Sequence, residues 1–194
     1  MNHSDISTKD LIQETAMDLF KTNDYETVTV MDICRACNIT KRTFYYHFAS
    51  KADLLNGIID YWGIKAERLM STFINEKRNI DILWQLMRVY CSHSQKYGPN
   101  IMRQVYTLML ENGRDIRFPY KMYLYDLAVQ LVRKAQDTGE IMNRAVPEDI
   151  VFILYHAFRS ISISWASENG PYDLIEEFRK SFDIIVDHSY TEDK

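Results

Sequence analysis

The side chains best suited to chemistry lie in one short segment, residues 41–47. Its sequence, KRTFYYH, combines two cations, three hydroxyl groups and a histidine, and it contains no carboxylate. Such side chains donate hydrogen bonds to phosphate oxygens, and an arginine such as Arg42 can bind O6 and N7 of guanine with two hydrogen bonds at once. The residue types therefore indicate nucleic-acid binding.

Other residue patterns give little support for enzyme chemistry. Cys34 and Cys37 form a single CxxC pair, which cannot complete the four ligands of a structural zinc site. The five histidines lack HExxH spacing, and neither a GxSxG sequence nor a glycine-rich phosphate loop occurs. We expect no enzyme activity, no metal site and no cofactor. The two cysteines are interpreted as core residues, with metal binding or redox sensing as the alternative.

The charge of the chain is unevenly distributed. The formal net charge is −4, yet residues 33–52 contain four basic side chains and no acidic one. Residues 1–32 contain two lysines against seven carboxylates. A basic segment beside an acidic one indicates a defined contact surface for an anionic partner rather than general affinity for nucleic acids.

Two short helices are predicted around this basic segment. Thr29 is placed to cap a helix near 31–37, and Thr40 to cap a second at 41–48. Asn38 between them suits the left-handed backbone of a tight turn. Together they form a helix-turn-helix, whose second helix can enter the major groove of DNA; the alternative is an ordinary amphipathic hairpin. The apolar residues expected in the shared core are Ile33, Cys34, Cys37, Ile39, Phe44 and Phe48.

A longer helix is predicted on each side of this pair. Apolar residues recur at helical spacing in residues 11–20, with Ser7 or Thr8 as the N-cap. After the pair, Ser50 caps a helix that continues from Lys51 for about twenty residues. The first helix completes an N-terminal three-helix unit.

The whole chain is predicted to be all-α. Six glycines and four prolines among 194 residues are too few for the many turns of a sheet protein. Further helices are predicted at 79–97, 100–112, 117–138, 147–168 and 172–188, which gives about nine in total. No apolar run approaches about 18 residues and the N-terminus lacks the apolar core of a signal peptide, so we expect a cytoplasmic protein without a membrane span.

A run of motifs extends through the predicted helix-turn-helix. It consists of Val28-Thr29-Val30, Asp32-Ile33, Ile39-Thr40-Lys41, Thr43-Phe44-Tyr45-Tyr46-His47-Phe48 and Ser50-Lys51-Ala52-Asp53-Leu54-Leu55. This run resembles the DNA-binding region of TetR-family (tetracycline-repressor-type) transcription regulators, over about residues 8–56. The usual Ala-Gly before the turn is replaced by Cys37-Asn38, and Arg42 stands where a small residue is frequent.

The resemblance implies a role for each matching position. The residues at positions that usually touch phosphate are Thr29, Thr40, Tyr45 and Lys51. Those at positions of groove contacts are Lys41, Arg42, Thr43, Tyr46 and His47. Phosphate contacts position the protein on DNA, and base contacts select the sequence.

The resemblance also implies a domain organisation and a function. Residues 1–52 are expected to form the DNA-binding domain, and residues 53–194 a helical ligand-binding and dimerisation domain. The expected function is transcription regulation by a ligand-responsive repressor that binds a palindromic operator in double-stranded DNA as a homodimer. The alternatives are a helical small-molecule-binding protein without regulatory output, and a helix-turn-helix activator or adaptor that acts through protein contacts.

The larger domain contains a stretch rich in methionine and tyrosine, between residues 84 and 165. Such side chains fill a core or line an adaptable ligand cavity. A cavity of this kind suits an apolar or aromatic small-molecule effector. The candidate wall residues are Trp62, Trp84, Tyr106, Met109, Tyr123 and Tyr155.

The last two predicted helices, near 147–168 and 172–188, are the expected dimer interface. They carry more apolar residues than one intramolecular face needs, and the TetR resemblance places a four-helix dimer bundle here. These residues are Ile150, Ile153, Leu154, Ala157, Ile161, Leu174, Phe178, Phe182 and Ile185.

Overall fold

A computed structural model describes residues 7–55, 78–111 and 122–187, the side chains of residues 122 and 123 excepted. Within these ranges the secondary structure is helical, with no strand. The helices are α1 (Thr8–Thr22), α2 (Val30–Ala36), α3 (Lys41–His47), α5 (Asn79–Tyr97), α6 (Pro99–Glu111), α7 (Met122–Asp137), α8 (Pro147–Ser167) and α9 (Leu174–Val186). Residues 51–55 are also helical. The all-α prediction is confirmed for the described part of the chain.

The N-terminal helices begin and end where local sequence signals place them. Ser7 caps α1 by accepting a hydrogen bond from the Asp10 N–H, and Thr29 caps α2 in a capping box with Asp32. Asn38 adopts φ = 53°, the left-handed conformation predicted for the turn. Thr40 then caps α3 by accepting from the N–H of the residue three positions on.

The helix-turn-helix has a small core of its own. Ile33, Cys34, Phe44 and Phe48 are buried, as predicted. The two other residues expected in this core, Cys37 and Ile39, are half-buried and pack against it. Neither cysteine forms a disulfide, and burial raises the pKa of the Cys34 thiol. Within the described residues, no group of three or more histidine, cysteine or acidic side chains is arranged for a metal ion.

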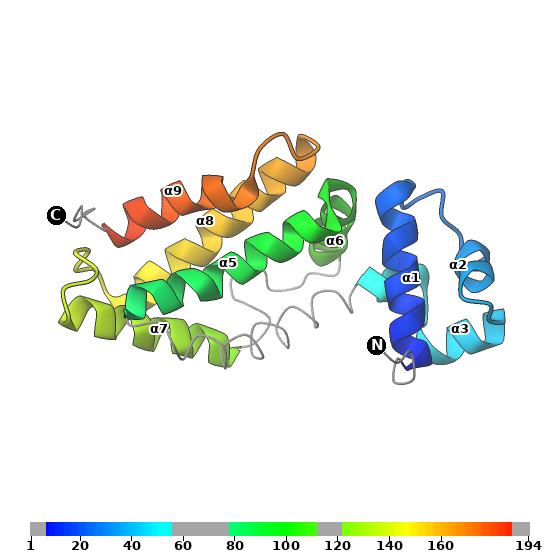
Figure 1. Ribbon diagram of the computed structural model, residues 1–194, viewed down its shortest axis with the longest axis horizontal. Coiled ribbons are helices and arrows are strands. Elements are labelled where there is room, and N and C mark those ends of the chain that lie inside the picture. Colours follow the sequence, from blue (N-terminus) through cyan, green and yellow to red (C-terminus); the bar gives the residue numbers. More distant parts are fainter. Residues whose placement is uncertain (1–6, 56–77, 112–121, 188–194) are drawn as a thin grey trace.

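The remaining helices form a second, larger bundle (Figure 1). Helix α5 packs against α6, α7 and α9, and α8 packs against α6, α7 and α9. Helix α6 also contacts α1, which joins the bundle to the N-terminal unit. The Arg103 side chain on α6 donates hydrogen bonds to the carbonyl oxygen of Ala166 at 2.8 Å and to Oδ1 of Asn169 at 2.7 Å. Helix α6 thus contacts the N-terminal unit and is also hydrogen-bonded to the end of α8.

The predicted helix ranges agree with the observed helix ends to within two residues wherever those ends are described. Gly98, Gly139 and Gly170 all adopt positive φ, where L side chains are strained. Gly170 has a further reason, because a Cβ atom there would lie 3.1 Å from the Trp165 ring. That ring is fixed by a 2.9 Å hydrogen bond from its Nε1 to the Tyr172 carbonyl oxygen. The predicted range 117–138 agrees with α7 over its described residues; residues 112–121 lie outside them.

Helix α8 is long and apolar enough to cross a membrane by length and composition alone, although the sequence contains no unbroken apolar run of that length. Its sides pack against α6, α7 and α9, as those of a core helix do. Leu154, Tyr155 and Phe158 are buried in that packing.

Candidate nucleic-acid interface

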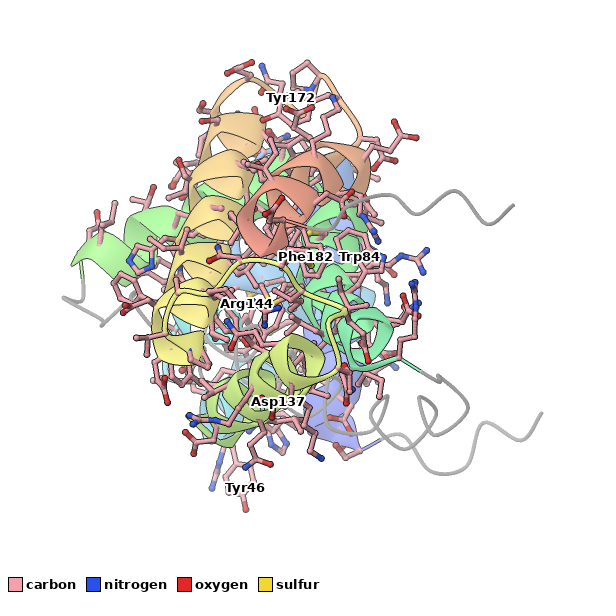
Figure 2. All side chains as sticks on the ribbon, turned by 90° about the vertical axis from the view of Figure 1, so that its left-hand side faces the viewer. Tyr46, Trp84, Asp137, Arg144, Tyr172 and Phe182 are labelled. Carbon is pink, nitrogen blue, oxygen red and sulfur yellow. The ribbon has the colours of Figure 1, made fainter. Side chains whose placement is uncertain are left out.

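Helix α3 has an apolar side turned into the core and a polar side turned to solvent. Phe44 is fully buried, and Phe48, which caps the helix, is 3% exposed. On the other side Tyr45 is 53% exposed and Tyr46 is 84% exposed, and Lys41 and Arg42 are exposed as well. Figure 2 shows Tyr46 projecting away from the body of the protein. An aromatic side chain so exposed contributes little to the fold and is available to a partner.

Thr40, which caps α3, is hydrogen-bonded to Thr43 in the first turn of the helix. The Thr40 hydroxyl accepts a hydrogen bond from the Thr43 N–H at 3.1 Å, and the two hydroxyl oxygens lie 2.9 Å apart. This arrangement fixes the first turn of the helix, so Lys41 and Arg42 project from a rigid base. His47, in the last turn, is half-buried, with its ring 4.9 Å from that of Tyr46.

Thr29 is engaged in the cap of α2. Its hydroxyl donates to Oδ2 of Asp32 at 2.5 Å, and its backbone N–H donates to the same oxygen at 2.9 Å. These hydrogen bonds, with the nearby Arg35, hold the pKa of Asp32 below its usual range. Arg35 binds Oδ1 of Asp32 at 3.2 Å. One of the four cations of the basic segment is therefore paired with a carboxylate, which the sequence analysis did not foresee.

Lys51 binds protein groups in addition to any role at DNA. Its Nζ donates to the carbonyl oxygens of Tyr25 at 2.6 Å and Val28 at 3.0 Å. It also lies 4.1 Å from the centre of the Tyr25 ring, and burial raises the pKa of that tyrosine to about 12, with Glu26 contributing. Lys51 thus ties the start of the helix at 51–55 to the loop before α2. The sequence reasoning missed this contact because it joins residues 26 positions apart.

The predicted DNA-contacting residues therefore fall into two groups. On α3, Lys41, Arg42, Tyr45 and Tyr46 are exposed, with Thr43 and His47 half-buried beside them. The side chains of Thr29, Thr40 and Lys51 also hold the helix-turn-helix together. The arrangement is a basic and aromatic helix presented on a locally stabilised scaffold.

Residues 12–58 match the family described as bacterial regulatory proteins, tetR family. This match covers α1 from Ile12 onward, the helix-turn-helix and the start of the next helix. The N-terminal unit is thus similar to the DNA-binding region of the TetR family.

Two relatives among HTH-type transcriptional regulators extend the sequence similarity beyond the N-terminal unit. The HTH-type transcriptional regulator UidR of Escherichia coli (strain K12) is 26% identical over 140 residues, which is 69% of each chain. The HTH-type transcriptional regulator YxbF of Bacillus subtilis (strain 168) is 25% identical over 146 residues, which is 66% of this chain and 38% of that protein. The chain thus spans well under two thirds of YxbF.

Solved structures of TetR-type proteins share the fold over nearly the whole length. The Thermus thermophilus repressor FadR, in complex with lauroyl-CoA, aligns with a TM-score of 0.61 at 17% identity, covering 96% of this chain and 97% of that one. The regulatory protein TetR from Rhodobacter sphaeroides aligns with a TM-score of 0.62 at 17% identity, covering 92% and 98%. At these identities the likeness concerns the fold.

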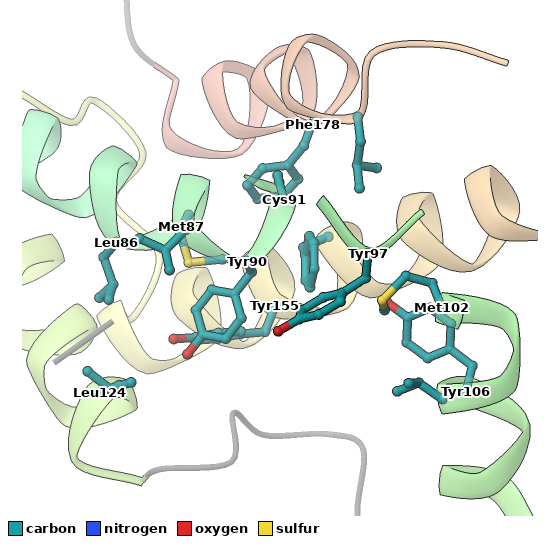
Figure 3. Close-up of a cluster of buried hydrophobic side chains, with 14 of the residues drawn as sticks. Leu86, Met87, Tyr90, Cys91, Tyr97, Met102, Tyr106, Leu124, Tyr155 and Phe178 are labelled. Atoms are coloured by element: carbon teal, nitrogen blue, oxygen red, sulfur yellow. The ribbon is translucent and has the colours of Figure 1, made fainter. Parts of the chain in front are cut away.

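The candidate effector residues lie in two places. Tyr106 and Met109 on α6 and Tyr155 on α8 are buried, and these two helices pack against each other. Figure 3 shows Tyr106 and Tyr155 within one cluster of buried hydrophobic side chains. Trp84 instead packs on α9, with its ring 6.1 Å from that of Phe178 and 5.2 Å from that of Phe182. Figure 2 shows Trp84 beside the second of these rings. Trp62 lies outside the described residues, as does the side chain of Tyr123 on α7.

The tyrosine hydroxyls in the cluster differ in their partners. Tyr106 donates to Oγ of Ser162 at 2.7 Å, and Tyr125 donates to the Glu148 carbonyl oxygen at 2.9 Å. The Tyr155 hydroxyl is buried and has no hydrogen-bond partner in the described part of the chain. Its burial raises the pKa of Tyr155 well above the usual value. The cluster therefore combines apolar packing with one hydroxyl, that of Tyr155 beside Tyr90, for which the described residues provide no hydrogen bond of suitable geometry.

The predicted dimer residues are only partly available to a partner. Five of them are buried within the protomer, namely Ile150, Leu154, Leu174, Phe178 and Phe182. Ile153 is exposed, and Ala157, Ile161 and Ile185 are half-buried. The excess of apolar residues in the sequence is therefore mostly used between α8 and α9.

Two exposed isoleucines on these helices were not among the predicted interface residues. Ile163 on α8 is 39% exposed and Ile184 on α9 is 79% exposed. Ile184 also lines a shallow hollow between the start of α8 and the end of α9, together with Asn143, Ala145, Asp149, Ile150, Ile153 and Ile185. Ile184 lies on an otherwise polar side of α9. This apolar residue among polar ones is the sequence signal that could have identified it as an interface candidate.

Proposed function

We propose that this protein is a one-component transcription regulator, a repressor that binds a palindromic operator through α3 and releases it when a small molecule binds the C-terminal bundle. The observation that carries the proposal is the TetR-type helix-turn-helix on which Arg42 and Tyr46 are exposed to solvent. A regulator of this kind acts in the cytoplasm, where its DNA is.

Base reading is assigned to the exposed side of α3. Arg42 has no ion pair with any residue the structure describes, so its guanidinium is free to bind O6 and N7 of a guanine. Lys41, Thr43, Tyr46 and His47 are proposed to make the other groove contacts. Thr29, Thr40, Tyr45 and Lys51 are proposed to bind phosphates around the same groove.

Dimerisation is proposed through α8 and α9. One short recognition helix makes few base contacts, and a two-fold pair doubles them and matches a palindrome. The exposed Ile153 and Ile184, which line the same hollow, and the exposed Ile163 on α8 support this surface, because exposed apolar side chains on two adjacent helices favour burial against a second copy. The two recognition helices must then lie about 34–36 Å apart to enter successive major grooves.

The effector site is proposed within the bundle of α5 to α8. Buried aromatic side chains with a few polar groups suit an apolar or aromatic molecule. Two transcription regulators of the same fold carry acyl-CoA in their structures, lauroyl-CoA in the Thermus thermophilus FadR and stearoyl-CoA in the Bacillus subtilis FadR. For the present chain these support an apolar effector as a class. The coupling needed is small, because a tenfold loss of operator affinity requires about 1.4 kcal/mol.

Selection of genomic fragments by the purified protein tests the DNA-binding proposal. At moderate salt we expect enrichment of a palindrome, and the double variant Arg42→Ala/Tyr46→Ala should lose that enrichment while its melting temperature stays unchanged. Recovery of fragments without a common palindrome would contradict the proposal. If the double variant still enriched the palindrome, base recognition would have to be assigned to residues outside α3.

A further inference from the structure

The positive charge of the N-terminal unit is less available than its sequence suggests. Its described residues, 7–55, contain six lysines and arginines. Lys21 binds Oδ1 of Asp18 at 2.8 Å, Arg35 binds Asp32, and Lys51 binds two backbone carbonyls. Each of these three cations already has an acceptor within the protein.

The other three cations have no ion pair with any described residue. They are Lys9, Lys41 and Arg42, and all three are exposed. Two of them are the first residues of α3. The third comes from a different helix, the first turn of α1, and no motif in the sequence marked it.

Lys9 lies at the opposite end of α3 from the other two. Its Nζ is 5.7 Å from the ring centre of Phe48, the residue that caps the C-terminal end of α3. Figure 1 shows the first turn of α1 beside that end of the helix. The three cations without an ion pair to a described residue therefore lie at the two ends of α3. Seven helical residues span about 10 Å, so the two ends are separated by roughly the width of a major groove.

We propose that Lys9 is a phosphate-binding residue that holds the C-terminal end of α3 against the DNA backbone. This inference rests on the proposed function of α3. The last turn of the helix contains no lysine or arginine, and Phe48 and Ala49 after it carry no charge. Near this end Lys51 already donates to two backbone carbonyls, so the Lys9 ammonium group supplies the phosphate contact that limits pivoting of the helix in the groove. The Phe48 ring positions the lysine stem without neutralising its charge.

The salt dependence of binding to a mixed-sequence duplex of about 30 base pairs tests this inference without knowledge of the operator. Each phosphate neutralised contributes about −0.9 to the slope of log affinity against log salt. In full-length protein, Lys9→Gln should therefore flatten the slope by about 0.9 per recognition helix, and Lys9→Arg should restore it. Operator and mixed-sequence duplexes should lose affinity by the same factor.

Lys21→Gln is the matched control. It removes the same charge from the same helix, but at the other end and from a residue already paired with Asp18. We expect its slope to equal that of the wild type, and both variants to keep the wild-type melting temperature. Equal slopes for Lys9→Gln and the wild type would overturn the inference, as would equal flattening by both variants, which would reflect net charge alone. If the wild type itself bound no duplex, the proposed function would fail instead.

Discussion

Nζ of Lys51 lies 2.6 Å from the carbonyl oxygen of Tyr25 and 4.1 Å from the centre of its ring. One side chain therefore joins the helix that follows the helix-turn-helix to the loop that precedes it. The same lysine occupies a position assigned to phosphate binding, so its two roles must be separated by experiment.

Replacement of Lys51 by methionine keeps the aliphatic stem and removes the donors. We expect the free energy of unfolding to fall by about 1.5–3 kcal/mol, because hydrogen bonds from a charged donor to two carbonyls are lost. Amide hydrogen exchange in residues 25–30 should accelerate. Lys21→Met, which removes an exposed cation from the same unit, should change stability by less than about 0.5 kcal/mol. A loss of DNA affinity with unchanged stability and exchange would assign Lys51 to DNA alone.

Removal of the buried hydroxyl of Tyr155 and removal of that of Tyr106 should have opposite effects on the free energy of unfolding. Tyr155→Phe deletes a hydroxyl without a partner among the described residues, so stability should stay equal or rise by up to about 1 kcal/mol. Tyr106→Phe breaks the hydrogen bond to Ser162 and should lower stability by about 1 kcal/mol. Urea unfolding at a constant m-value measures both. A clear loss of stability in Tyr155→Phe would mean that its hydroxyl is engaged in the folded protein.

The exposed isoleucine of α9 offers a test of the dimer surface. Ile184→Glu should leave the protomer folded, because this side chain is 79% exposed, but should shift the sedimentation coefficient from dimer to monomer. Leu110→Glu on α6, at a residue 66% exposed, introduces the same charge elsewhere and should leave the dimer intact. A monomeric wild type at micromolar concentration, or a dimeric Ile184→Glu, would place the interface elsewhere.

Alkaline pH should destabilise the N-terminal unit. A tyrosine whose pKa is higher in the folded than in the unfolded protein favours folding below the unfolded value, and this contribution is lost as the pH rises toward the folded value. For Tyr25 that window extends from pH 10 to about pH 12, and buried Tyr155 acts in the same direction. Melting temperature should therefore fall above pH 10, and less steeply in Tyr25→Phe. An identical fall in that variant would assign the effect to other tyrosines.

Local signals made the N-terminal unit predictable. Capping by Ser7, Thr29 and Thr40 and the turn at Asn38 depend on residues three or four positions away, and all four occur as predicted. The buried side of α3 follows from helical spacing of Phe44 and Phe48. Sequence therefore sufficed for the elements and for which side of α3 faces out.

Contacts between distant residues were not predictable in the same way. The pairing of Lys51 with the loop before α2 and the position of Lys9 beside Phe48 arise only when three helices meet. Likewise, the sequence does not show which apolar residues of α8 and α9 pack within the protomer and which face a partner. The structure shows that Trp84 packs against Phe178 and Phe182, so these two belong to the intramolecular core. Periodicity shows that a residue is on an apolar side, and tertiary packing decides what covers it.

The ion pairs Lys21–Asp18 and Arg35–Asp32 have a kinetic consequence. Because Lys21 and Arg35 are paired with carboxylates, each N-terminal unit offers few unpaired cations to the phosphates of DNA. Affinity for DNA of arbitrary sequence depends on the counterions that such cations release, so this affinity should be low. We expect short dwell times on bulk chromosome and a large unbound pool at cellular salt. Occupancy of a target operator would then follow changes in protein copy number closely, because little of the protein would be bound to non-specific DNA.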